Sequence, residues 1–269
     1  MNRAIRWATP AGCVAAAVIG LPASAKAEPP PICADRPAKA TAVCTVPAGK
    51  FQLETGAVDW TLAKNAGVRT ELLAVGASVL KLGVSDTSDL QVGFVPYVQL
   101  TVNQAGTRSR VSGIGDVTVR YKQRLTENDA RVQVAAIPFV KLPTAARGLG
   151  NTKVEGGLAV PVSFAVAGPV TMTLGPELDL LADADGSGRH FGVINLVSVS
   201  AVVARRVTIG GELWSAWNLD PAGTIRQASA DAAIAYAAAN NLQLDLGANL
   251  GLTRNTPDLE LYAGASILF

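Results

Sequence analysis

Apolar and polar residues alternate along most of the chain after Phe51, in short segments that turn residues separate. Leu90, Val92 and Phe94 occupy every second position, with Gln91 and Gly93 between them. A period of two residues is that of a β-strand, whose side chains point alternately to opposite faces. The pattern predicts an all-β chain.

The alternation predicts twelve strands. They run over residues 50–60, 69–82, 90–100, 113–125, 131–142, 154–166, 170–180, 191–203, 207–217, 225–237, 242–252 and 259–269. One segment, residues 228–239, is rich in alanine, which favours a helix by propensity. Gln227, Ser229 and Asp231 nevertheless share one strand face, so we predict a strand there as well.

The connections between these strands alternate in length. Tight turns are predicted at residues 86–89, 126–129, 167–169, 205–206 and 238–241, and longer loops at 61–68, 101–112, 143–153, 182–190, 218–224 and 253–258. Outer-membrane barrels have short periplasmic turns and longer external loops. An even number of strands with both termini on the periplasmic side gives this order. The sequence therefore predicts a transmembrane antiparallel up-and-down β-barrel of about twelve strands.

Composition supports a membrane barrel over a soluble β-protein. The chain has 269 residues, of which 16% are charged, and its mean hydropathy is +0.29. No run of 18 apolar residues follows the N-terminal region, so strands are the means left to span a membrane. A secreted β-sandwich would also alternate and is the alternative fold, but it would carry more charge outside. The net charge of +2 gives no reason to expect a nucleic-acid partner.

The N-terminus has the pattern of a signal peptide. Arg3 and Arg6 precede an apolar stretch over residues 11–21, and small residues follow it. We expect residues 1–27 to be removed by cleavage after Ala25 or Ala27. Export of a barrel of this kind predicts the bacterial cell outer membrane as its location.

Residues 28–49 form a leader ahead of the barrel, which we assign to residues 50–269. Cys33 and Cys44 are the only cysteines after the predicted cleavage site. A lone pair in an exported chain predicts a disulfide, with two free thiols as the alternative. Such a disulfide would close a small loop, and this loop could reach into the lumen.

Several short motifs resemble a known family. They are Gly113-Ile114-Gly115-Asp116-Val117, Leu142-Pro143-Thr144, Gly211-Glu212-Leu213-Trp214 and Asn241-Leu242-Gln243-Leu244-Asp245-Leu246-Gly247. In this order they resemble the outer-membrane barrel family named for a meta-pathway of phenol degradation, whose members are labelled transporters. The family usually has Gly after Leu-Pro-Thr, whereas this chain has Ala145, which leaves the following loop undefined. The resemblance implies a barrel and uptake of small compounds, including aromatic or hydrophobic ones.

The polar face of the predicted strands should line the lumen. Its candidate residues are Glu54, Asp116, Arg120, Lys122, Arg131, Lys141, Glu155, Glu177, Asp179, Glu212, Asp231, Asp245, Asn249 and Glu260. Both signs of charge occur, so the lumen could pass small solutes or could close itself with ion pairs. The alternation alone leaves both alternatives open.

Chemistry beyond transport has little support in the sequence. Asp183 and Asp185 with Gly188 nearby match the first half of a calcium loop, but the twelfth position is Ile194, which has no carboxylate. An external loop is the simpler interpretation. His190, the single histidine, could pair with Ser187 or Asp185, but no third group would orient it. We therefore expect neither an enzyme, nor a metal site, nor a cofactor.

The functional prediction is a channel or transporter for passive passage of small solutes. The alternative is a non-conducting barrel that acts through its external loops. The expected partners are outer-membrane lipid, lipopolysaccharide and small-molecule solutes. The outer-membrane assembly machinery is a further expected partner, because the last strand alternates up to a terminal Phe269.

Overall fold

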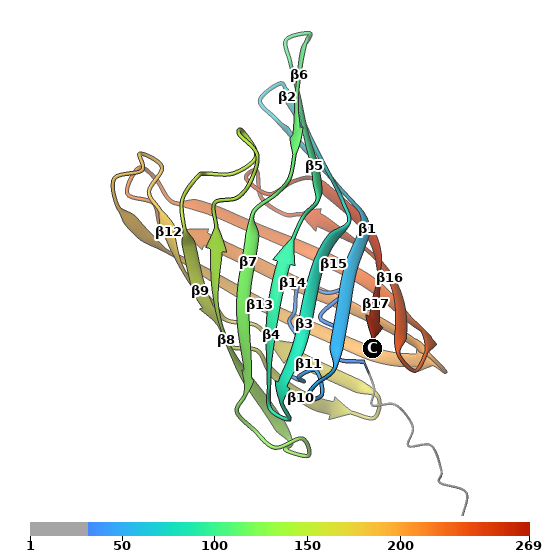
Figure 1. Ribbon diagram of the computed structural model, residues 1–269. Helices are drawn as coiled ribbons and strands as arrows, with labels where there is room; N and C mark the ends of the chain where they lie inside the picture. Colours follow the sequence, from blue (N-terminus) through green and yellow to red (C-terminus); the bar gives the residue numbers. More distant parts are fainter. Residues whose placement is uncertain (1–31) are drawn as a thin grey trace, which may run out of the picture.

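The alternating segments form a closed antiparallel barrel in the computed structural model, which describes residues 32–269 (Figure 1). Neighbouring strands in the chain are neighbours in the sheet, so the barrel is of the up-and-down type that the alternation predicts. None of the described residues forms a helix of the length and hydropathy that a membrane span requires. The predicted signal peptide lies outside the described residues.

The sheet contains 17 strands that build 12 spanning segments, because five segments are interrupted. The strands are β1 (Phe51–Asn65), β2 (Val68–Val75), β3 (Ala77–Ser85), β4 (Ser88–Phe94), β5 (Tyr97–Gln104), β6 (Thr107–Gly113), β7 (Val117–Arg124), β8 (Val132–Leu142), β9 (Glu155–Ala159), β10 (Val162–Ala167), β11 (Val170–Leu174), β12 (Glu177–Ala182), β13 (Arg189–Ala204), β14 (Val207–Asn218), β15 (Ile225–Ala239), β16 (Leu242–Gly251) and β17 (Leu259–Leu268). The alanine-rich segment is therefore strand β15 and not a helix.

Proline accounts for three of the interruptions. Pro96 separates β4 from β5, Pro161 separates β9 from β10, and Pro176 separates β11 from β12. Proline has no N–H to donate to the neighbouring strand, so the ladder breaks there while the chain continues across the wall. Each interrupted segment thus remains one span of the barrel.

The first and last strands close the barrel. β1 pairs with β17 from Gln52 opposite Leu268 to Leu62 opposite Leu259. The Phe269 N–H also donates to the Phe51 carbonyl oxygen at 2.8 Å. Closure removes the open sheet edge, whose unpaired N–H and C=O groups would be costly in hydrocarbon.

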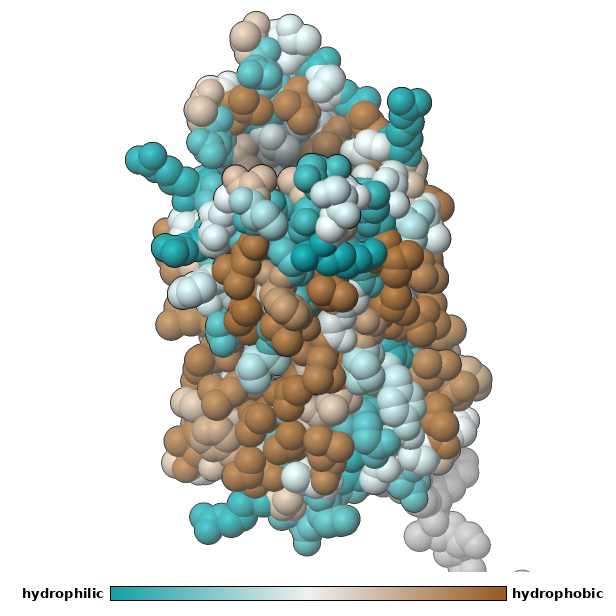
Figure 2. All heavy atoms as spheres, turned by 90° about the vertical axis from the view of Figure 1, so that its left-hand side faces the viewer, coloured by the Kyte–Doolittle hydropathy of each residue, from teal (hydrophilic) through white to brown (hydrophobic). Residues whose placement is uncertain are grey.

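The distribution of side chains is inverted relative to a soluble protein. Inside, Lys81 and Lys122 are only 1% and 0% exposed, whereas outside, Leu213 and Leu246 are 62% and 58% exposed. Figure 2 shows apolar residues over much of the wall, with hydrophilic residues gathered toward the two ends. An apolar outer face with a polar interior is the arrangement of a transmembrane barrel. A β-sandwich, which hides its apolar face, is excluded.

Two of the connections predicted as long loops are tight hairpins instead. β1 passes to β2 through Ala66-Gly67, and β5 passes to β6 through Ala105-Gly106, with φ between 48° and 82° at all four residues. Positive φ at both central residues defines the turn type that best fits a two-residue hairpin. The paired strands β2, β5 and β6 project beyond the rest of the barrel (Figure 1). The prediction of loops was wrong there because both faces of this projection are polar, so the alternation disappears although the strands continue.

The two ends of the barrel differ. One end, which we call the turn end, carries the connections at 86–87, 125–131, 168–169, 205–206 and 240–241. The other, the loop end, carries the connections at 143–154, 183–188, 219–224 and 252–258 together with the projecting hairpins, and these connections are longer than those of the turn end except for 125–131. Phe269 and the start of β1 both lie at the turn end, so the described N-terminal segment enters the barrel from there.

Candidate functional site

Residues 32–50 lie inside the barrel, and we call this segment the plug. A disulfide joins Cys33 to Cys44, with 5.8 Å between their Cα atoms, and closes most of the plug into one loop. Cys33, Val43 and Val46 are 4%, 3% and 0% exposed. The plug therefore supplies much of the small apolar core of a barrel whose wall turns polar residues inward.

The first strand anchors the start of the plug. The Gln52 side chain accepts from the Cys33 N–H at 3.1 Å and donates to the Cys33 carbonyl oxygen at 2.6 Å. The Glu54 carboxylate accepts from the N–H groups of Asp35 and Arg36 at 3.1 and 3.0 Å. These bonds satisfy plug backbone groups that would otherwise be buried without partners.

Two buried lysines hold the Asp35 carboxylate of the plug. Lys81 Nζ lies 2.6 Å from Asp35 Oδ2, and Lys122 Nζ lies 2.9 Å from Asp35 Oδ1. Lys81 also pairs with Glu54, and Lys122 Nζ donates to the Ala42 carbonyl oxygen at 2.8 Å. Lys81 is on β3 and Lys122 is on β7, so this side of the lumen holds the plug carboxylate between two ammonium groups.

The charge state of Asp35 follows from these contacts. Burial by itself would raise the pKa of the Asp35 carboxyl, but the Lys122 and Lys81 ammonium groups outweigh burial and hold the pKa well below its ordinary value. Asp35 is therefore ionised while the plug is docked. Its charge stabilises docking through the two lysines.

The opposite wall presents carboxylates. Arg36 donates to Asp245 on β16, with Nη2 to Oδ1 at 2.8 Å and Nε to Oδ2 at 3.3 Å. Lys39 Nζ lies 2.9 Å from Asp231 Oδ2 on β15 and 2.8 Å from the Ser229 hydroxyl oxygen. The plug thus crosses the lumen, with Asp35 paired to the lysines on one side and Arg36 and Lys39 paired to the carboxylates on the other.

Glu212 on β14 fixes the tip of the plug through its backbone. Its two carboxylate oxygens accept from the N–H groups of Lys39 and Ala40 at 2.8 and 3.1 Å. Lys39 Nζ also lies 4.7 Å from the centre of the ring of Trp214, which is on β14 like Glu212. A carboxylate that accepts from two consecutive N–H groups orients the chain as well as binding it.

Glycine on the wall gives the plug room to pack. A Cβ atom at Gly83 of β3 would lie 2.0 Å from the Pro47 carbonyl oxygen and 2.5 Å from that of Val46. The Gly83 N–H donates to the Lys50 carbonyl oxygen at 3.0 Å, and the Gly49 N–H donates to the Gly83 carbonyl oxygen at 2.9 Å. This close backbone approach requires a residue without a side chain.

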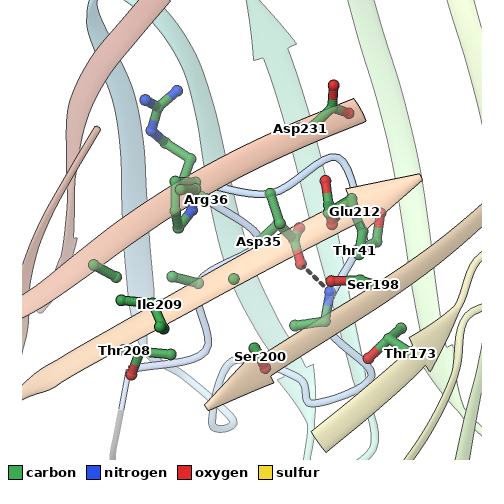
Figure 3. A pocket seen from close by; sticks show the side chains of 18 of the residues that line it. Asp35, Arg36, Thr41, Thr173, Ser198, Ser200, Thr208, Ile209, Glu212 and Asp231 are labelled. Carbon is green, nitrogen blue, oxygen red and sulfur yellow. Dashed lines mark hydrogen bonds between the residues drawn. The ribbon is translucent and has the colours of Figure 1, made fainter. Parts of the chain in front are cut away.

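The plug does not fill the lumen. A cavity of about 230 Å³ separates it from the wall of β11 and β13–β16, and Thr173, Ser198, Ser200 and Thr208 line this cavity with hydroxyl groups (Figure 3). A second cavity of about 230 Å³ lies between Lys39 of the plug and Glu177, Leu196 and Trp214 of the wall. Thr41 of the plug lines both cavities, so the plug tip separates two spaces along the same side of the lumen.

The structure distributes the predicted lumen residues over several groups. Glu54, Lys122, Glu212, Asp231 and Asp245 contact the plug. Lys141 pairs with Glu155 at 2.8 Å and with Asp116 at 3.4 Å, while Asn249 donates to Glu260 at 2.7 Å. Glu177 and Asp179 share the inner face of β12, and Arg120 is on β7. Arg131 is exposed in the turn before β8, outside the strand that was predicted to hold it.

The residues that match the first half of a calcium loop separate in space. The Asp185 carboxylate accepts from the Ser187 hydroxyl at 2.8 Å. Asp183 instead lies against His190, with 2.8 Å between Asp183 Oδ1 and His190 Nδ1. The two aspartates therefore do not converge on one ion, and Ser187 is bonded to Asp185.

Sequence reasoning missed several residues that hold the plug. They are Gln52, Lys81 and Asp89 of the wall, and Asp35, Arg36 and Lys39 of the plug. Lys81 gave the clearest signal, because it is the one charged residue of an apolar strand and falls on the inward phase. The plug residues have no periodicity, so no pattern identified them.

Comparisons with known proteins agree on the fold. The family model described as "Putative MetA-pathway of phenol degradation" matches residues 34–269. The COG4313 outer membrane channel from Pseudomonas putida F1 superposes with a TM-score of 0.66 at 15% identity, covering 84% of this chain and 98% of that one. No curated protein matches the sequence.

Two further solved structures are also outer-membrane barrels. The NanC porin has a TM-score of 0.51 at 12% identity, covering 81% of this chain and 98% of that one. The translocator domain of the autotransporter NalP from Neisseria meningitidis has a TM-score of 0.52 at 12% identity, covering 82% and 89%. At these identities the likeness concerns the fold.

Proposed function

Because this chain belongs to the family described as "Putative MetA-pathway of phenol degradation", we propose that it is an outer-membrane channel for passive passage of small solutes, with the plug as its gate. The observation that carries the proposal is the pair of cavities beside the plug. They lie on either side of Thr41 at the plug tip, beside β11–β14 of the wall. Two of the structurally similar proteins are an outer-membrane channel and a porin, which supports the same function.

The plug suits a gate because polar contacts hold it. Ion pairs and hydrogen bonds to Lys81, Lys122, Asp231 and Asp245 fix its position, and the lumen around it is polar. Water that enters the lumen can replace such contacts one by one, whereas an apolar core would resist displacement as a unit. A shift of the plug tip at Thr41 would join the two cavities.

The proposed solutes are small compounds, including aromatic or hydrophobic ones. The family description supports phenol-like solutes. Hydroxyl groups of Thr173, Ser198 and Ser200, together with Tyr262, line the first of the two cavities and could exchange hydrogen bonds with a phenolic hydroxyl. Transport would be passive, driven by the concentration gradient.

A second function is a barrel that stays sealed and acts through its loop end. The paired charges favour this alternative, because most charges that face the plug have a partner of opposite sign. A sealed barrel would hold these pairs permanently, whereas a gated channel would break them. The two functions therefore differ in a measurable property, the passage of ions and solutes.

We place the protein in the outer membrane, with the turn end toward the periplasm and the loop end outside. Short periplasmic turns and longer external connections support this orientation. The proposed partners are lipid, lipopolysaccharide and the outer-membrane assembly machinery. The assembly machinery would contact Phe269, which follows β17 and is 60% exposed. Cleavage of the signal peptide after Ala25 or Ala27 would free the N-terminus to enter the barrel.

Solute flux into liposomes tests the proposed function. Purified full-length mature protein would be reconstituted, and the uptake of phenols, fatty acids and sugars compared with empty liposomes. The channel predicts faster uptake of at least one class of small solute. Uptake equal to that of empty liposomes, from protein that is folded and inserted, would support the sealed barrel.

A further inference from the structure

Three side chains from different elements converge at the loop end. Asp183 follows β12, His190 is the second residue of β13, and Asp220 lies in the connection after β14. One potential ligand atom from each lies within 4.8 Å of the other two. His190 Nδ1 is 2.8 Å from Asp183 Oδ1 and 3.6 Å from Asp220 Oδ2. These side chains are well shielded, with exposed fractions of 14%, 5% and 9% in the order of the sequence.

A neutral His190 imidazole leaves the charge of this cluster unbalanced. If the imidazole is neutral with its proton on Nε2, the Nδ1 lone pair faces two carboxylates and repels them. If the proton is on Nδ1, this one N–H can donate to Asp183 at 2.8 Å, while Asp220 receives no hydrogen bond from the ring at 3.6 Å. Nε2 is then a buried acceptor. Nε2 is buried without a hydrogen-bond partner among the described residues. In both neutral forms two carboxylate charges remain close together with no cation between them.

The two carboxylates are held in place for a further ligand. The Ala184 N–H donates to Asp220 Oδ2 at 2.8 Å, and the Ala222 N–H donates to Asp220 Oδ1 at 2.7 Å. Asp183 packs against Gly188, where a Cβ atom would lie 2.4 Å from Asp183 Oδ2. The backbone thus fixes the orientation of both carboxylates, as the surroundings of metal ligands commonly do.

The surroundings also leave space for water. A cavity of about 520 Å³ lies beside Asp220, and Asn151, Glu155 and Asn218 are the other polar residues among its otherwise apolar lining. A divalent ion held by three protein ligands fills its remaining positions with water or another small ligand. Waters in this cavity could reach an ion bound between the three side chains.

We propose that Asp183, His190 and Asp220 bind one divalent transition-metal ion of the Zn²⁺ class. Nitrogen from imidazole with two carboxylate oxygens is a donor set that Zn²⁺ accepts at about 2.0–2.2 Å, with ligand atoms about 3.3 Å apart. The separations of 2.8 and 3.6 Å bracket that spacing, so small side-chain rotations suffice. The ion fastens the connection after β14 to the β12–β13 hairpin. Sequence reasoning did not foresee this site, because Asp220 is remote in sequence from the other two residues.

The test is titration of the intact mature barrel in detergent with Zn²⁺ by calorimetry, without an affinity tag that contains histidine. We expect one ion per chain. His190→Gln and Asp220→Asn should each weaken binding at least about tenfold. Asp185→Asn is the matched control, because Asp185 is exposed in the same hairpin and bonds Ser187 instead. It should leave the affinity unchanged.

A second measurement avoids variants that fold poorly. His190 is the only histidine in the sequence, so ¹⁵N-labelled histidine gives a single pair of ring signals in wild-type protein. Zn²⁺ should shift the signal of one ring nitrogen at one equivalent, and Mg²⁺ should leave both signals in place. Absence of a Zn²⁺-induced shift, equal responses to Mg²⁺, or unweakened binding by His190→Gln would each overturn the proposal.

Discussion

Arg36 in the plug donates to both carboxylate oxygens of Asp245 on β16, at 3.3 and 2.8 Å, across 209 positions of sequence. Asp245 has no exposed side-chain surface, and Arg36 is 22% exposed. The pair ties the plug to the wall opposite Lys81 and Lys122. A segment that is continuous with β1 and held by ion pairs on both sides of the lumen can restrict passage through the barrel.

Removing Arg36 should loosen the plug. Arg36→Ala leaves the Asp245 carboxylate buried without its partner, and breaking a buried pair in this way costs about 3 kcal/mol. The cost falls on the docked state, because an undocked plug leaves Asp245 open to water. Single-channel recording should show a larger open probability than in wild-type protein. Arg69→Ala is the control, because it breaks an exposed pair on the projecting hairpin and should leave the open probability nearly unchanged. Equal open probabilities of the two variants would argue against docking by Arg36.

The Asp35 carboxylate predicts a response to acid. Its pKa is lowered in the docked plug, so docking gains stability from Asp35 at every pH above the ordinary value of 3.8. This stabilisation is lost as the pH falls below 3.8 toward the lowered pKa, and the channel should then open more often. Conductance recorded from pH 7 to pH 3 checks the direction. Asp35→Asn should lose this component, and an identical acid response in the variant would contradict the assignment.

Gly83 provides a way to displace the plug without altering its charges. Gly83→Ala would place a Cβ atom 2.0 Å from the Pro47 carbonyl oxygen, and the nearest atoms all belong to the plug. The barrel should therefore fold, while the plug shifts and solute flux increases. Gly211→Ala is the matched control, because its Cβ would meet only the Asp231 carbonyl oxygen at 3.7 Å. Similar flux in both variants would show that the close approach at Gly83 does not position the plug.

The disulfide should limit how far the plug can move. Cys33 and Cys44 are 11 positions apart in the sequence, and a cross-link over a loop of this size removes about 3 kcal/mol of chain entropy from the undocked segment. Reduction should therefore favour the undocked plug and raise conductance. The measurement is a current trace before and after addition of dithiothreitol, with Cys33→Ser/Cys44→Ser protein as the control that should not respond. A response of the double variant to the reductant would contradict the assignment.

The outer face should tolerate apolar residues and reject charge. Leu246 on β16 is 58% exposed and neighbours Ile234 across the strand pair. Leu246→Arg near the middle of the span should destabilise the folded barrel by about 2–4 kcal/mol. Folding titrations in lipid vesicles measure the change in the free energy of unfolding. A change below about 1 kcal/mol is typical of a surface substitution in water, and it would show that this face does not contact hydrocarbon.

The sequence determines the barrel more clearly than it determines the plug. Alternation in β4 and β16 reports directly which residues face hydrocarbon, because the membrane imposes one polarity on one whole face. The same signal fails in the second half of β5 and in β6, where both faces are polar and residues 101–112 were predicted as a loop. The plug is harder still, since Asp35, Arg36 and Lys39 find partners that only the closed barrel brings together.

The predicted lumen residues show the same limit. Asp231 and Asp245 were placed on the inner face by their phase, but phase does not identify the partner on another segment. The register between neighbouring strands places Lys141 next to Glu155 and Asp116. Lys39 meets Asp231 because the plug enters the lumen from the turn end. Arg131 fell outside the lumen because β8 begins one residue later than predicted.

Single-channel conductance of the intact mature chain, compared with a variant that lacks residues 32–46, tests the central claim most directly. If the plug narrows a route through the barrel, the intact protein should give small or infrequent steps, and the shortened protein should give larger and more frequent ones. Equal conductance in the two proteins, with both correctly folded and inserted, would contradict the account.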